Sequence, residues 1–123
     1  IKPAATAQEA LDRTWTAIER AGFNRVEFNQ PSADPTITDV VIGPHSVGNW
    51  GHGLGPSLAF FNPERLTYAL RPTTLISVEL FAFTANPDWG NAKIRIPLED
   101  DAIITERGVE WLYPVNSRLL IIK

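Results

Sequence analysis

The chain has 123 residues and a formal net charge of −3 at pH 7, with 44% hydrophobic and 20% charged residues. These values are typical of one globular domain, so we expect a single domain over residues 1–123 and exclude a largely disordered chain. Because cysteine is absent, a disulfide framework, a thiol nucleophile and a thiolate metal site are excluded as well.

The same features narrow the classes of partner. A negative net charge without any run of Lys or Arg disfavours nucleic acid. No apolar run reaches the roughly 20 residues of a membrane-spanning helix, so no membrane span is expected. The chain begins at Ile1 and contains no methionine, which indicates a processed product or a piece of a longer protein.

The first predicted element is an amphipathic helix over residues 7–20. Thr6 and Glu9 have the spacing of a capping box, in which the Thr6 hydroxyl accepts from the Glu9 amide and the Glu9 carboxylate accepts from the Thr6 amide. An apolar stripe with spacings of four and three follows, and a glycine then stops the helix: Leu11, Trp15, Ile18 and Gly22.

After this helix, short β-branched or aromatic runs alternate with Pro, Gly and Asn, which predicts strands. The last run is almost continuously apolar, as is typical of a central strand covered on both faces. The predicted fold class is α+β, with one N-terminal amphipathic helix packed on a mostly antiparallel sheet or a partly closed β-barrel or sandwich. The predicted strands are 25–28, 37–42, 58–61, 66–70, 74–83, 92–98, 102–105, 109–113 and 118–123.

Two consecutive runs are predicted to form a hairpin across the turn at residues 86–90. Even-numbered positions carry the apolar face of both runs, so we expect pairs such as Leu80 opposite Ile94. This register places Glu79 beside Arg95. A half-exposed structural ion pair is then the simplest role of Glu79, and a general acid is the alternative.

The glycine-rich segment, residues 43–56, is the main candidate for a site, because it holds five of the eight glycines and both histidines. Glycine lets a backbone approach a ligand or another chain closely, but this spacing matches neither a dinucleotide-binding nor a P-loop pattern. Tryptophan in a loop or turn offers an apolar face and an N–H donor to a sugar or a protein, unless it folds back over the core. The predicted binding residues are His45, Asn49, Trp50, His52 and Trp89.

We therefore predict a non-enzymatic binding or assembly module. Its protein or carbohydrate partner is recognised through the loop 43–56 and the turn 86–90, without a cofactor or a metal. An assembly subunit that forms a homo-oligomer has the same sequence features, and for it an extracytoplasmic or virion-associated location is favoured.

The alternative is a small hydrolase, either ribonuclease-like or glycan-cleaving. Here His45 and His52 form an acid/base pair that Asp39 or Glu64 assists. Their odd separation places the two imidazoles on opposite faces of a straight strand, so the pair requires that the loop folds back. Two histidines without a matched third ligand do not predict a metal site.

Overall fold

The computed structural model describes residues 1–28, 30–48 and 51–115 of the chain. The fold is α+β, as predicted: one N-terminal helix packs on a mixed six-stranded sheet, which is open and not closed into a barrel. The elements in chain order are α1 (Ala7–Arg20), β1 (Asn24–Arg25), β2 (Asp39–Ile42), β3 (His45–Ser46), α2 (Pro63–Leu66), β4 (Leu75–Asn86), the 3-10 helix η1 (Pro87–Trp89), β5 (Ala92–Thr105) and β6 (Gly108–Trp111).

The helix α1 has the predicted bounds and the predicted N-terminal cap. The Glu9 amide donates to the Thr6 hydroxyl at 3.2 Å, while the Glu9 carboxylate accepts from the amide of Ala5, one residue before the expected donor. Leu11 and Trp15 are buried. Local sequence therefore determines where this helix begins and which face it buries.

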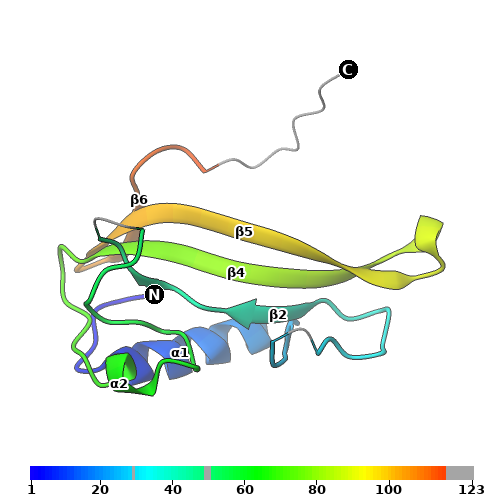
Figure 1. Ribbon diagram of the computed structural model, residues 1–123, viewed down its shortest axis with the longest axis horizontal. Coiled ribbons are helices and arrows are strands. Elements are labelled where there is room, and N and C mark those ends of the chain that lie inside the picture. Colours follow the sequence, from blue (N-terminus) through cyan, green and yellow to red (C-terminus); the bar gives the residue numbers. More distant parts are fainter. Residues whose placement is uncertain (29, 49–50, 116–123) are drawn as a thin grey trace.

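The sheet runs in the order β1-β2-β4-β5-β6, and β3 pairs with another part of β4. Only β1 and β2 are parallel among the described strands. Figure 1 shows α1 on one side of the sheet and the long β4–β5 hairpin extending beyond it.

Several strand predictions were wrong or lie outside the described residues. The runs 92–98 and 102–105 belong to one strand, β5. The run 58–61 is a connection, and the run 66–70 begins with the last residue of α2 and continues as a connection. Pro63 at the first turn explains α2, because proline fits the start of a helix. The predicted central strand 118–123 lies outside the described residues.

The predicted register of the hairpin was also wrong. Leu80 pairs with Leu98, and Glu79 pairs with Glu99. The reason is the turn, because η1 is followed by two left-handed residues and five residues stay outside the ladder between Asn86 and Ala92.

The core lies between α1 and the even-numbered face of β4, as the pattern predicts. Ile76 on β4 and Ala102 on β5 are completely buried and face each other across the hairpin. The largest other members of this cluster are Leu11, Trp15, Ile42, Leu58, Leu66, Leu70 and Ile104.

The far half of the hairpin is more open. Among the described residues, β6 pairs only with the last part of β5, and the Leu112 amide donates to the Asp101 carbonyl, so residues 92–100 have β4 as their only paired strand. Pro97 fits such an edge because it has no N–H to donate. Ile96 and Leu98, on the core-facing side of the hairpin but beyond the helix, are 38% and 51% exposed.

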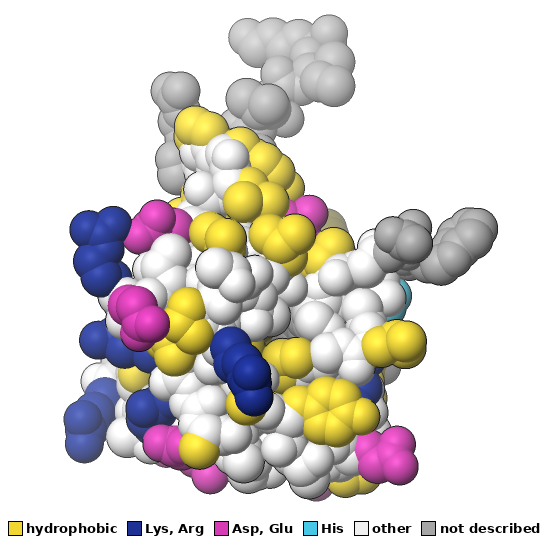
Figure 2. Space-filling view, turned by 90° about the vertical axis from the view of Figure 1, so that its left-hand side faces the viewer, with side chains coloured by type: hydrophobic (Ala, Val, Ile, Leu, Met, Phe, Trp, Pro, Cys, Tyr) yellow, Lys and Arg dark blue, Asp and Glu magenta, His cyan; other side chains and the backbone are white. Residues whose placement is uncertain are grey.

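Apolar side chains also gather at the other end of the sheet. In Figure 2 they lie near the top of the face shown, beside the segment that leaves β6. Trp111, Leu112 and Tyr113 are each about half exposed there.

Of the helices in the described part of the chain, none is long and apolar enough to cross a membrane.

The position of the core predicts that replacing isoleucine by alanine destabilises the protein by different amounts at two positions of the hairpin. Ile76→Ala should lower the free energy of unfolding by about 2–5 kcal/mol, because it leaves a cavity under α1. Ile96→Ala should cost less than about 1 kcal/mol, because Ile96 is already partly in water. Urea unfolding followed by tryptophan fluorescence measures both, and equal losses would place the core elsewhere.

Candidate functional site

The glycine-rich segment folds back on itself beside β4. The Ser46 carbonyl accepts from the Gly53 amide, and the Ser46 amide donates to the Pro56 carbonyl at 2.9 Å. The two arms approach so closely that a Cβ on Gly48 would lie 2.8 Å from the Gly53 Cα. Glycine is therefore required here by close backbone contact.

Arg65, at the end of α2, holds the returning arm. Its guanidinium donates to the Gly55 carbonyl at 2.7 Å, to the Ser46 hydroxyl at 2.9 Å and to the Gly53 carbonyl. These bonds provide donors for the Gly53 and Gly55 carbonyls, which lie outside the strands and have no partner in the sheet ladder. One side chain from a distant element thus fixes the shape of the loop.

The folded loop brings the two histidines together. The rings of His45 and His52 are stacked, with centroids 4.4 Å apart and planes inclined by 22°. His45 lies in β3 and is buried, whereas His52 is exposed. Asn49 and Trp50, which were predicted as binding residues of the same loop, lie outside the described residues.

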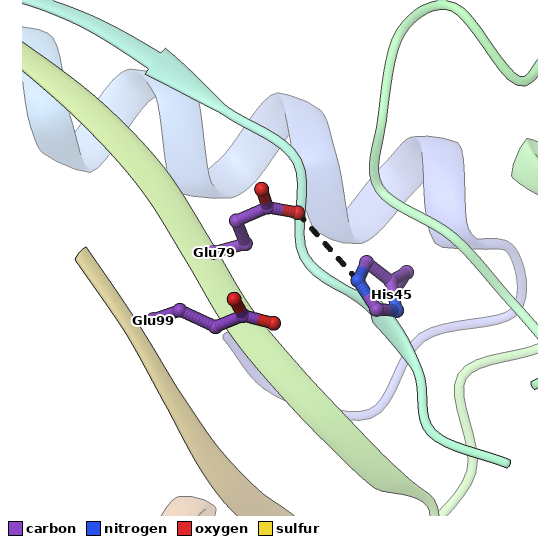
Figure 3. A group of neighbouring side chains, drawn as sticks. All are labelled: His45, Glu79 and Glu99. Carbon is purple, nitrogen blue, oxygen red and sulfur yellow. Dashed lines mark ion pairs between the residues drawn. The ribbon is translucent and has the colours of Figure 1, made fainter. Parts of the chain in front are cut away.

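Two carboxylates complete the cluster. Glu79 from β4 and Glu99 from β5 are directly opposite each other, and both point toward His45 (Figure 3). A Glu79 carboxylate oxygen lies 3.6 Å from His45 Nε2. One ligand atom from each of the three residues can be chosen so that all lie within 4.8 Å of one another.

Hydrogen bonds orient two of these groups. His45 Nδ1 lies 3.2 Å from the Ser46 carbonyl oxygen, so the tautomer with its proton on Nδ1 can donate there. In that tautomer, Nε2 presents a lone pair to the carboxylates. The Ser77 hydroxyl donates to Glu99 at 2.8 Å and holds that carboxylate toward the cluster.

The cluster is acidic. Like charges directly opposite each other on neighbouring strands repel, so the pairing of Glu79 with Glu99 is unfavourable without a cation. Within the described residues, no Lys or Arg forms an ion pair with either carboxylate. Arg95, the partner predicted for Glu79, lies instead over the Phe81 ring, 3.8 Å from its centroid.

Asp39 does not join the histidines. On β4 the partners of Asp39 and His45 are Phe83 and Ser77, six residues apart, which corresponds to about 20 Å at ~3.3 Å per residue. Asp39 is fully buried and forms an ion pair with Lys93. Its role is structural.

Opposing effects act on the pKa of Asp39. Burial disfavours its charged form, but hydrogen bonds from Asn24, Lys93 and Ser32 outweigh burial and hold the pKa of Asp39 below its usual range. A carboxyl with a lowered pKa stabilises the fold above its unfolded pKa of about 3.9, and this contribution is lost as pH falls through the folded value.

Glu64 and Trp89 are not joined to the histidines. Glu64 is exposed on α2, and neither a hydrogen bond nor an ion pair connects it to either ring. Trp89 is 63% exposed at the tip of the hairpin, so it does not fold back over the core. From Ser77 to Asn86 the strand β4 spans nine residues, about 30 Å, which separates Trp89 from the glycine-rich loop.

Three contributors to this cluster were not assigned from the sequence. Glu99 and Ser77 take part only because of the observed register of the hairpin. Arg65 stands 10 residues after Gly55, and no local pattern marks it as the donor that closes the loop. The only hint in the sequence that Arg65 closes the loop was its position a few residues after the glycine-rich segment.

Comparisons with known proteins add no family to this geometry. The chain matches no protein family model, and neither the curated proteins nor the solved structures contain a match.

The buried ion pair gives a testable stability difference at neutral pH. Asp39→Asn leaves the Lys93 ammonium buried without its counter-charge, so we expect a loss of about 3–5 kcal/mol in the free energy of unfolding. Asp88→Asn, at an exposed position, should change it by less than about 0.5 kcal/mol. Urea titrations at pH 7 measure both variants.

The same variant tests the lowered pKa of Asp39. Wild type should lose stability as pH falls below about 4, and Asp39→Asn should lose less over that range because it has no carboxyl to protonate. Parallel pH profiles of the two proteins would contradict a lowered pKa.

Proposed function

We propose that the chain is a non-enzymatic binding or assembly module that recognises a protein partner. The observation that carries this proposal is Trp89, which is 63% exposed at the tip of a hairpin that extends beyond the helix (Figure 1). Large exposed aromatic side chains are enriched among the residues that dominate binding energy in interfaces. The left-handed Gly90 and Asn91 fix the turn that presents the indole.

The distance between the two predicted recognition segments favours a protein over a glycan. The turn 86–90 and the loop 43–56 are separated by about 30 Å along β4, which exceeds the length of a short oligosaccharide. A partner that contacts both must cover the hairpin between them. The open edge at 92–100 and the exposed Ile96 and Leu98 provide surface for such a contact, and a second copy of the chain is one candidate.

Site-specific crosslinking tests this proposal. A photo-crosslinking amino acid at Asp88, next to the indole, should give one discrete adduct, either with a second copy or with another protein from the cells that make the chain. Trp89→Ala should reduce the yield of that adduct by at least about tenfold, since truncation of such an anchor costs 2 kcal/mol or more.

The control places the same crosslinker at Glu106, an exposed turn residue at the other end of β5. Analytical ultracentrifugation distinguishes self-association from a heterologous partner. A monomer that forms no discrete adduct, or an adduct that Trp89→Ala leaves unchanged, refutes the proposal.

A second candidate function is a small hydrolase, and one observation favours it. The stacked rings of His45 and His52 place two imidazoles within reach of one substrate, with Glu79 beside the buried ring. An acid/base pair of this kind would act on a phosphodiester or a glycosidic bond. Glu79 then takes the assisting role first assigned to Asp39 or Glu64.

The hydrolase candidate predicts complete dependence on the rings. His45→Gln/His52→Gln should abolish cleavage of an RNA oligomer or a chromogenic glycoside, while Trp89→Ala should leave it unchanged. Substrate turnover over hours measures this. If wild type cleaves neither class of substrate faster than the double variant, the hydrolase candidate is wrong.

A further inference from the structure

We infer that His45, Glu79 and Glu99 form a binding site for Zn²⁺. A histidine nitrogen and carboxylate oxygens are common zinc ligands, and three such ligands with an open position are the donor set of many zinc sites. The three side chains come from three neighbouring strands and converge on one side of the sheet (Figure 3). This site is independent of the proposed recognition by Trp89.

The separations between the ligand atoms suit a zinc ion. Ligand atoms at ~2.1 Å from zinc lie about 3.4 Å apart in a tetrahedral site. His45 Nε2 and the Glu79 oxygen are 3.6 Å apart, and no pair in the set exceeds 4.8 Å. Glu99 is exposed and bonded through one carboxylate oxygen to the Ser77 hydroxyl, so a rotation of its side chain can close the remaining distance of up to about 1.4 Å.

The hydrogen bonds around the ligands have the pattern of a metal site. Zinc-binding histidines usually donate their other ring N–H to a carbonyl or carboxylate, which aims the free nitrogen at the metal. His45 Nδ1 donates to the Ser46 carbonyl and leaves Nε2 for the ion. The Ser77 hydroxyl in the same way holds the Glu99 carboxylate.

The charge of the cluster favours a cation. Two carboxylates and an imidazole lone pair face one point, and Asp101 lies opposite Ser77 on the same side of the hairpin. Among the described residues, His45 is the only basic side chain that forms an ion pair with either of these carboxylates. A divalent ion neutralises both carboxylates, whereas protonation of the ring supplies one charge.

His52 is not a ligand of the same ion. Its ring is nearly parallel to that of His45, so the in-plane lone pairs of the two rings run side by side and do not converge. His52 instead covers one side of the site. The imidazole ligand favours Zn²⁺ over Mg²⁺ or Ca²⁺, and the general order of affinities places Zn²⁺ above Mn²⁺.

Isothermal titration calorimetry of the full chain with Zn²⁺ tests the inference. We expect one saturable site, with binding weakened at least about tenfold in Glu99→Gln and in Glu79→Gln. Glu99 is exposed, so its variant should remain folded. Glu106→Gln, which alters an exposed carboxylate outside the cluster, should bind within about twofold of wild type.

A second measurement places the ion. Mn²⁺ added to the labelled protein should broaden the amide NMR signals of Ser46, Ser77 and Glu99 before those of Glu106. His52→Gln should retain Zn²⁺ affinity within about threefold, because His52 is not a ligand.

Three results would overturn the inference. They are the absence of saturable Zn²⁺ binding, binding that both glutamate variants leave unchanged, and broadening that begins elsewhere in the chain. The result for the recognition surface is read separately, because Trp89→Ala, which should reduce the crosslinked adduct at Asp88, lies outside the cluster and should leave Zn²⁺ binding unchanged.

Discussion

The register of the β4–β5 hairpin is the constraint on which the rest of the structure depends. Five turn residues outside the ladder set every cross-strand pair along it. That register brings Lys93 to the buried Asp39 at one end and places Glu99 beside Glu79 toward the other. A slip by two residues would preserve the inner and outer faces but would move Lys93 from its place opposite Ala85, so the contacts of Asp39 would have to form anew. The observed register is the one in which Lys93 reaches both Asp39 and Ser32.

Features encoded by neighbouring residues were predictable from the sequence. The capping residues Thr6 and Glu9 and the apolar stripe defined α1, and the alternation in β4 identified the face that carries Ile76. The register was not predictable in this way. It depends on the left-handed conformations of Gly90 and Asn91, and these decide how many residues the turn removes from the ladder.

The candidate site shows the same division between local and distant information. The histidines were identifiable as candidates by residue type, but their stacking depends on contacts that no sequence spacing encodes. Arg65 reaches across from another element, and β3 pairs with a strand about 30 residues further along the chain. Glu99 joins His45 only through the pairing of β5 with β4. Asp39 was chosen by residue type and serves the fold instead.

Pro97 has a consequence for how this sheet can grow. It fits the ladder only with its nitrogen turned away from β4, toward the open edge formed by the described residues 92–100. An additional strand along that edge meets a missing donor in the middle and cannot form an uninterrupted row of hydrogen bonds. The edge therefore favours a short, discrete docking over the unlimited stacking that produces fibrils. Pro97 therefore works against amyloid-like stacking along this edge of the hairpin.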